Sequence, residues 1–235
     1  MKPDIRSSRN DVDLIWIALG LIIFAIVLVR VSWLNDDAYI TFRIVENFVN
    51  GYGPVYNVGE RVQVFTHPLW MLLISGVYFL YNLLNISFPA ALPFIAILIS
   101  WFIIASAVAF FALQAWTRPA AFMLGLWLLL NSKAVTDYLA SGLENPLTFA
   151  LLAAFTYYYW KRQSNSPVLQ PRALLQLSFI AGLATLNRMD TLLIFAPAIA
   201  VVWWHSPKRI RAVGSIALGF LPFILWEFFS LVYFG

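Results

Sequence analysis

Two adjacent carboxylates, Asp36 and Asp37, follow directly on the apolar run 14–34, in the segment NDDAYITFR. A carboxylate beside apolar lipid holds its proton more tightly, which suits a general base that works near neutral pH. Neighbouring helix residues point about 100° apart, so we expect only one of the two to face a reactant. The structural alternative is that one carboxylate caps a surface helix and the other favours its positive end.

A histidine and several cations are candidates for binding an anion. His67 stands between Thr66 and Pro68, where a helix is expected to begin, and helix N-termini bind phosphate groups. The plainer interpretation is a cap or an interfacial residue. Three further cations would form an electrostatic cluster around a lipid phosphate, although each taken singly is a surface or snorkelling residue: Arg61, Lys133 and Arg188.

Two short motifs and one isolated acid add further candidates. SGLEN, 141–145, puts Glu144 at a helix start, where a negative residue is also favoured for structural reasons. LNRMD, 186–190, puts Arg188 and Asp190 in a tight turn, where a simple ion pair is the plainer interpretation. Glu227 lies inside the last apolar segment. An acid there costs roughly 2.5–3.5 kcal/mol on insertion scales, so a functional role is a reasonable hypothesis.

Some classes of site are disfavoured by the residues available. The sequence has no cysteine, which excludes disulfides and thiolate metal sites. Hard divalent cations prefer oxygen ligands, so carboxylates can in principle hold one, but no ligand-spaced motif supports such a site. We therefore assign no metal ligand and no certain cofactor. The basic residues occur singly or in short loop clusters, which is not the pattern of a nucleic-acid-binding protein.

The elements that must position these residues are apolar segments. Of the 235 residues, 62% are hydrophobic and 11% are charged, and the mean hydropathy is +0.80. Soluble domains carry about 25% charged residues, so the composition predicts an all-α polytopic membrane protein. The first segment is not followed by a small-x-small cleavage site and is expected to be a retained anchor. Apolar segments are expected at 14–34, 68–84, 89–116, 120–140, 146–160, 173–187, 191–204 and 212–234.

The charges indicate which segments cross the membrane. The basic N-terminus, with Lys2, Arg6 and Arg9, is expected inside. If all eight segments crossed, the basic loops near 161–172 and 208–211 would lie outside, against the positive-inside rule. One non-crossing segment before residue 146, either 68–84 or 120–140, removes both conflicts and leaves seven crossings. The outer face then carries most of the acids: Asp36, Asp37, Glu46, Glu60, Asp137, Glu144 and Asp190.

The outer loop 35–67 is expected to begin with a short helix. Asp36 is predicted as its N-cap and Gly51 as its stop. A second helix is expected to start at Pro68, with Thr66 or His67 capping it. The first helix is amphipathic and suits the membrane interface, because it has an apolar face of Ala38, Phe42, Val45 and Val49 and a polar face of Arg43, Glu46, Asn47 and Asn50.

The loop also resembles a known family. NDDAYITFRIVENFVNGYGPVYNVGERVQVFTHPLW is similar to the first outer loop of bacterial GT-C-type glycosyltransferases, in the branch of the mycobacterial B-type arabinofuranosyltransferases. SGLEN resembles that group's Gly-Met/Leu-Glu-Thr turn, and LVYFG resembles its Tyr-Tyr-Gly segment. LNRMD resembles its Thr-Arg-Pro-Asp/Glu turn, from which Asn187 and Met189 depart. The matches run in order from 35 to 235.

The resemblance implies a fold and an activity. It implies a GT-C-like module of about seven transmembrane helices over 1–235, with surface helices in the 35–88 loop and 68–84 as the non-crossing segment. Such enzymes move a sugar from a polyprenyl-phosphate donor to an envelope glycan, lipid or protein acceptor. They do so at the outer face of the bacterial cytoplasmic membrane.

The resemblance also assigns roles to individual residues. Asp36 would deprotonate the acceptor hydroxyl, and Asp37 would orient the acceptor or the first helix. His67 would meet the donor phosphate. The remaining predicted substrate-binding residues are Arg43, Lys133, Glu144, Arg188 and Asp190.

One departure from the family leaves alternatives open. The family continues past its Tyr-Tyr-Gly segment with a Pro-Asn-Thr motif and more helices, so this chain is expected to lack the C-terminal part. A non-catalytic or inactive membrane subunit is the main alternative. A transporter that uses Glu227 is a weaker one, because the acids gather at one face rather than along a path through the bilayer.

Overall fold

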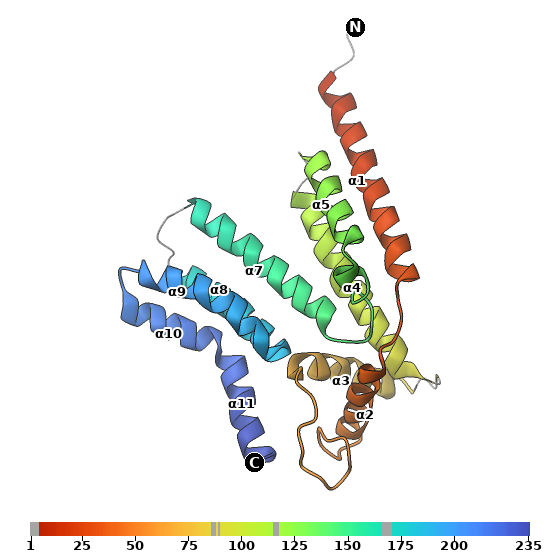
Figure 1. Ribbon diagram of the computed structural model, residues 1–235, viewed down its shortest axis with the longest axis vertical. Helices are drawn as coiled ribbons and strands as arrows, with labels where there is room; N and C mark the ends of the chain where they lie inside the picture. The colour runs from red at the N-terminus through yellow and green to blue at the C-terminus, as the bar shows by residue number, and fades with distance from the viewer. Residues whose placement is uncertain (1–4, 86–87, 89, 115–117, 166–170) are drawn as a thin grey trace.

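The computed structural model describes residues 5–85, 88, 90–114, 118–165 and 171–235, and every regular element that these residues form is a helix (Figure 1). This confirms the predicted all-α class. Lys2 and the side chains of Arg6 and Arg9 lie outside the described part, as do residues 89 and 115–116 at the predicted ends of segment 89–116.

All eight predicted apolar segments contain helices, and the outer loop contains one more. Two helices lie together at one end of the molecule, α2 (Asp36–Val49) and α3 (Pro68–Leu83) (Figure 1). Two very short elements lie in turns near that end, α6 (Lys133–Thr136) and the 3-10 helix η1 (Met189–Thr191). The other helices are α1 (Ile5–Arg30), α4 (Ala91–Gln114), α5 (Pro119–Asn131), α7 (Asn145–Asn165), α8 (Pro171–Asn187), α9 (Leu192–Trp204), α10 (Arg209–Gly219) and α11 (Leu221–Tyr233).

Three apolar clusters hold the helices together. Helices α1, α4 and α5 share a cluster around Phe24 and Leu126. Helix α8 packs against α7, α9 and α10 around Leu177 and Phe195. The third cluster joins α2, α3, α4 and α11, and Trp70 of α3 is fully buried in it. This last cluster anchors α2 and α3 to the other helices.

Helix α8 approaches α10 closely because two glycines face each other. A Cβ placed on Gly182 would lie 2.8 Å from the carbonyl oxygen of Gly219, and a Cβ on Gly219 would lie 2.5 Å from the Cβ of Ser178. Small residues at a helix crossing let the two backbones come together, as is typical of helices packed in membranes.

Several predicted boundaries differ from the structure, and four of the differences have a clear physical reason. Helix α1 ends at Arg30 instead of residue 34, because the next residues run extended beside another segment. Asn35, not Asp36, is the N-cap of α2. Segment 120–140 divides into α5 and α6 at Ser132. Segment 212–234 bends by 57° between α10 and α11, where Pro222 in the first turn of α11 cannot continue the hydrogen bonding of α10.

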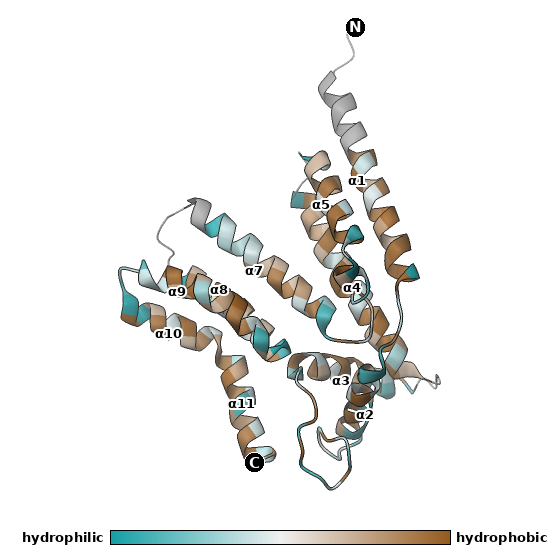
Figure 2. Cartoon of the chain, viewed as in Figure 1, coloured by the Kyte–Doolittle hydropathy of each residue, from teal (hydrophilic) through white to brown (hydrophobic). Residues whose placement is uncertain are grey.

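The length of the helices bears on the membrane prediction. Within the described residues, α4 alone is long and apolar enough to cross a membrane, and α10 and α11 qualify as one bent pair. Helices α5 and α9 have 13 residues each, so they span about 20 Å against a hydrocarbon core of about 30 Å. Seven crossings therefore remain a prediction. Hydrophobic residues nonetheless predominate along most of the helices (Figure 2). The exposed apolar side chains include Ile22, Ile26, Phe102, Leu128, Leu193 and Leu231.

Candidate functional site

A cavity of about 540 Å³ lies where four segments meet: the start of α2, the chain before α3, the turn before α7 and the turn after α8. These segments are distant in sequence, and Figure 2 shows polar residues at the ends of α7 and α8 that approach α3. The lining residues are Asn35, Asp37, Ile40, Thr41, Val64, Phe65, Thr66, His67, Tyr138, Leu143, Glu144, Asn145 and Arg188.

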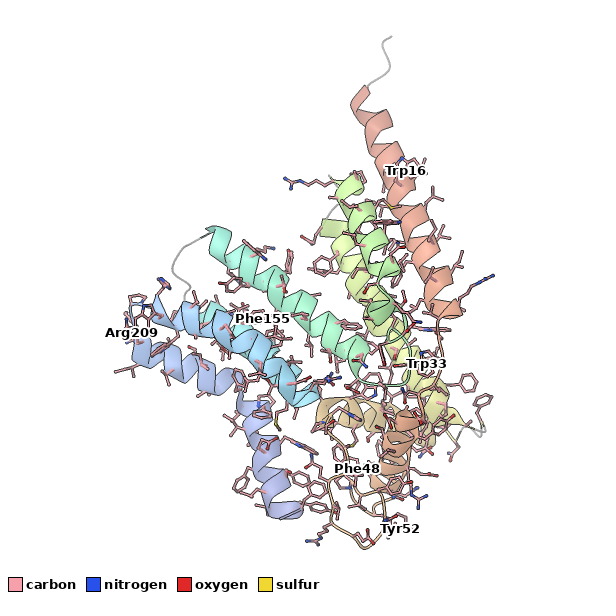
Figure 3. The ribbon with its side chains drawn as sticks, in the orientation of Figure 1. Trp16, Trp33, Phe48, Tyr52, Phe155 and Arg209 are labelled. Atoms are coloured by element: carbon pink, nitrogen blue, oxygen red, sulfur yellow. The ribbon has the colours of Figure 1, made fainter. Side chains whose placement is uncertain are left out.

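The extended residues after α1 are fastened to the turn before α7. The backbone N–H of Trp33 donates to the Ala140 carbonyl at 3.0 Å, and that of Asn35 donates to the Ser141 carbonyl at 3.0 Å. The Trp33 indole, which Figure 3 labels at this junction, donates to the Asp137 carbonyl at 2.6 Å. These bonds set the start of α2 against the SGLEN turn.

Gly142 lets that turn fit between α2 and α3. Its φ is +80°, a left-handed conformation that favours glycine, and a Cβ there would lie 2.9 Å from both the Ala38 Cβ and the Leu34 Cδ2. The buried Trp70 indole of α3 donates to the Gly142 carbonyl at 3.1 Å. The glycine of SGLEN is therefore required by the backbone conformation and by the space available.

Glu144 is the centre of a polar network. Only 9% of its side chain is exposed, and it accepts a hydrogen bond from Arg188 Nη1 at 3.1 Å. Arg188 also donates through Nε and Nη2 to the two oxygens of Asp190, at 3.1 and 2.9 Å. The buried Asn187 amide donates to the Glu144 carbonyl at 3.0 Å and to Thr148 at 2.9 Å. The LNRMD turn is thereby bound to the SGLEN turn, and the predicted Arg188–Asp190 ion pair is confirmed.

The ion pairs shift the pKa values of Arg188 and Asp190 in opposite directions. The hydrogen bonds that Arg188 donates to Asp190 raise the pKa of Arg188, and Glu144 adds to this effect, although burial opposes it. The hydrogen bond from Arg188 lowers the pKa of Asp190. Both groups are therefore charged over the physiological pH range.

His67 is neutral at the same pH. Burial is the largest effect and lowers the pKa of His67 below its ordinary value of 6.5, and Arg188 lowers it further, against the opposing effect of Glu144. The 3.6 Å approach of Nδ1 to Glu144 is therefore a contact of a neutral ring with a carboxylate, not an ion pair, near pH 7. Nε2 lies 2.7 Å from the Thr41 hydroxyl. His67 occupies the N-cap position of α3 but makes no side-chain cap hydrogen bond.

The two adjacent carboxylates have different surroundings in the structure. The Asn35 side chain accepts from the backbone N–H of Asp37 at 2.9 Å and so caps α2. Asp37 lines the cavity together with Thr41, one helical turn further on. Asp36 is not among the lining residues, and its side chain accepts from the Asp37 backbone N–H at 3.1 Å. The role predicted for Asp36 stays a prediction.

Two predicted substrate-binding residues lie away from this cavity. Arg43 is two residues beyond Thr41, about 200° around the helix, and lies 5.1 Å from the Tyr56 ring centre. Lys133 is on the one-turn helix α6, where 88% of its side chain is exposed and its ammonium lies 4.0 Å from Asp137. Arg61 lies over the Tyr233 ring instead. Of the three predicted outer cations, Arg61, Lys133 and Arg188, Arg188 alone is among the residues that line this cavity.

Sequence reasoning overlooked several residues that shape the site. Thr41 follows Asp37 at a helical spacing of four, a signal that could have identified it. Asn187 was noticed only as a departure from a family pattern, although an amide beside Arg188 is well suited to joining two turns. Nothing in the sequence pattern around Tyr138 indicated that it would line the site. Among the described side chains, no group of three or more histidines and acids is spaced to hold a metal ion.

Comparisons with known proteins give two relatives. No protein-family model matches the chain, and no solved structure matches it significantly. A Mycobacterium tuberculosis protein named terminal beta-(1->2)-arabinofuranosyltransferase is 29% identical over 212 residues, which cover 86% of this chain and 33% of the relative. A Corynebacterium glutamicum protein of the same name is 27% identical over 222 residues, which cover 87% of this chain and 32% of the relative. The chain spans about a third of the length of these curated relatives.

Proposed function

We propose that the chain carries the site-forming module of a membrane glycosyltransferase. It would move a sugar, arabinofuranose by analogy with the names of its two relatives, from a polyprenyl-phosphate donor to an acceptor hydroxyl. The observation that carries the proposal is the cavity in which Asp37, His67, Glu144 and Arg188 meet from four separate segments.

The reaction needs one base and one site for a developing negative charge. A carboxylate takes the proton from the acceptor hydroxyl, and the resulting oxygen attacks the anomeric carbon of the donor. The bond between that carbon and the phosphate oxygen breaks, and polyprenyl phosphate departs with the electron pair. Because a phosphate is a stable leaving group, no general acid is required.

Asp37 is our candidate for the base. The family resemblance assigns this role to Asp36, but Asp37 lines the cavity and Asp36 does not. Helix α2 begins at these residues, and Asn35 fixes the backbone on which Asp37 stands. A carboxylate held at a capped helix start is well positioned to act repeatedly in one geometry.

Arg188 is our candidate for stabilising the phosphate. A guanidinium has five N–H donors, and three of them are used in the bonds to Asp190 and Glu144. The remaining two are available to an anion in the cavity, and a fixed cation in a partly buried site stabilises developing charge strongly. Neutral His67 adds no charge to the cavity, and its two ring nitrogens face Glu144 and Thr41.

The distribution of polar residues supports a membrane setting with the site at one surface. The acids of the cavity lie at one end of the helices, and basic residues lie at the other, where Arg162 contacts Gln176 and Arg209 lies 4.9 Å from the Trp204 ring centre. Figure 3 shows Arg209 far from Trp33, which marks the cavity end. With the positive-inside rule, this arrangement supports an outward-facing site at the bacterial cytoplasmic membrane. The donor's lipid would stay in the bilayer against the exposed apolar helix surfaces.

The test is a transfer assay with the chain reconstituted in lipid nanodiscs. The donor is a short-chain polyprenyl-phosphate arabinofuranose labelled in the sugar, and the acceptor is a synthetic arabinofuranoside. We expect labelled product from the wild-type chain and from Glu46→Gln, whose carboxylate is exposed outside the cavity. We expect none from the double variant Asp36→Asn/Asp37→Asn. Absence of product from the wild-type chain, or equal product from the double variant, would reject the proposal.

A further inference from the structure

Glu227 lines a second pocket that the proposed reaction does not use. This pocket has a volume of about 280 Å³ and is formed by α11, the end of α8 and the chain before α3. Glu227 is half-buried on an otherwise apolar stretch of α11, and within the described residues it makes no ion pair. An acid placed in this way without a partner points to a ligand.

The second pocket adjoins the cavity of the candidate site. Phe65 and Thr66 line both of them, so the two spaces lie on either side of the chain that leads into α3. Aromatic contacts hold this segment of chain in place. Phe65 is buried, and its ring centre lies 5.9 Å from that of Trp226 and 6.3 Å from that of Phe234. A ligand in the second pocket would therefore lie next to one in the cavity.

The polar groups of the pocket call for a ligand that donates hydrogen bonds. Ser230 donates to the Gln63 carbonyl oxygen at 2.6 Å, so this oxygen is already engaged. Thr185 is 2% exposed and donates its hydroxyl hydrogen to the Ala181 carbonyl at 2.9 Å, so it is engaged within α8. The Glu227 carboxylate can only accept. Hydroxyl groups of a ligand satisfy this carboxylate, and Phe223 and Pro68 offer an apolar surface beside it.

We propose that this Glu227 pocket binds one uncharged sugar ring, with Glu227 accepting hydrogen bonds from its hydroxyls. Sugar rings combine donor hydroxyls with an apolar face, which is the combination that the pocket matches. The identification of this ring as the acceptor's rests on the proposed function, because the adjoining cavity would hold the donor phosphate. Glu227 would then be a residue that positions the acceptor and would take no part in the proton transfer.

The test measures binding of methyl arabinofuranoside by saturation-transfer difference NMR, with the whole chain in nanodiscs. We expect Glu227→Gln to raise the dissociation constant about tenfold or more, the effect of losing a hydrogen bond to a charged group. Glu227→Asp keeps the charge and should give a smaller loss. Glu46→Gln removes an exposed carboxylate elsewhere and should bind as the wild-type chain does. Thermal unfolding of each variant shows whether it is folded.

Two further arms identify the source of the ring and separate this proposal from the reaction. Glu227→Gln should weaken glycoside binding and leave binding of the short-chain polyprenyl-phosphate sugar unchanged, because the donor phosphate would lie in the adjoining cavity. If Glu227→Gln instead weakens only the donor, the ring is the donor's and the acceptor assignment is wrong. If folded Glu227→Gln binds the glycoside as tightly as the wild-type chain does, the proposal that this pocket binds a sugar ring is wrong. Binding that depends on Glu227 in a chain without transfer activity would uphold the pocket and reject the proposed function.

Discussion

The two sides of α2 hold their polar side chains in different ways. On the side of the polar loop, Arg43 and Asn47 donate to backbone carbonyls of Val55 and Tyr56, only 8 to 13 residues further along the chain. On the cavity side, Thr41 contacts His67 over a separation of 26 residues. The network continues from there to Glu144 and Arg188, which are 44 residues apart.

The local hydrogen bonds serve to fold the loop, whereas the long-range ones form the candidate site. Closing a short loop costs little conformational entropy, so these local hydrogen bonds give Arg43 and Asn47 a structural role in the loop. The long-range network brings polar and ionised groups of four segments together in a partly buried place, which is favourable only when every partner is present. Substitutions on the cavity side should therefore impair binding and transfer, and those on the loop side should have small effects.

The largest effect is expected from Arg188→Lys. A lysine cannot make the bidentate contact with Asp190 and also reach Glu144, so the exchange is not conservative here. Loss of the group that stabilises the leaving phosphate should lower the transfer rate about 10²–10³-fold. The turnover number at saturating donor measures this effect. A rate within threefold of the wild-type rate would show that Arg188 does not serve the reaction.

Gly142→Ala should damage the cavity through packing. The new Cβ would meet Ala38 and Leu34 at 2.9 Å, and the positive φ adds strain, so we expect a loss of stability of about 2 kcal/mol or more. Gly51→Ala is a matched control, because its φ of +85° is similar and no atom lies within 4 Å of the new Cβ. It should lose about 1 kcal/mol. Equal unfolding free energies for the two variants in detergent would contradict the crowding at Gly142.

His67 should make stability depend on pH. Its folded pKa lies below the ordinary value of 6.5, so the unfolded chain takes up a proton first as the pH falls. Stability contributed by the neutral ring is present above pH 6.5 and is lost as the pH falls from 6.5 towards the folded pKa. Asp190 changes stability only below its ordinary value of 3.8.

A thermal unfolding series between pH 8 and pH 5 measures this dependence. The unfolding temperature of the wild-type chain should fall over the lower half of the range, and that of His67→Gln should fall less. Parallel curves for the two proteins would mean that His67 is not the buried neutral group described above.

Arg43→Ala and Lys133→Ala should have the smallest effects. Both side chains are exposed and outside the cavity, and contacts of exposed charges contribute little, so we expect transfer rates within about twofold of the wild-type rate. Initial rates at low donor concentration are the sensitive measurement. A tenfold loss of transfer rate in either variant would show that the binding site extends across α2 or reaches α6.

The sequence predicted the helices well, and for a physical reason. Each segment is a continuous or nearly continuous apolar run bounded by glycine, proline or polar residues, and these signals are local. The bend between α10 and α11 was missed although Gly219 and Pro222 are visible in the sequence, because the close approach of Gly219 to α8 appears only in the fold. The N-cap was misplaced by one residue because Asn35 and Asp36 are both good caps.

The site was predicted in part. Glu144 and Arg188 were identified from their motifs, and the structure brings them together. The orientation of Asp36 relative to Asp37 depends on how α2 is turned about its axis, which is fixed by burial of Ala38 and Phe42 against the rest of the molecule. Lys133 was predicted only from the side of the membrane on which it is expected to lie. Many residues share that side, so this information does not determine whether a side chain reaches the cavity.

The most direct test of the central claim compares single-turnover transfer rates of Asp37→Asn and Asp36→Asn under saturating donor and acceptor. Because Asp37 lines the cavity and Asp36 does not, we predict a loss of about 10²-fold or more for Asp37→Asn and less than about tenfold for Asp36→Asn. A larger loss for Asp36→Asn than for Asp37→Asn would contradict the assignment of the base and the orientation of α2 on which it depends.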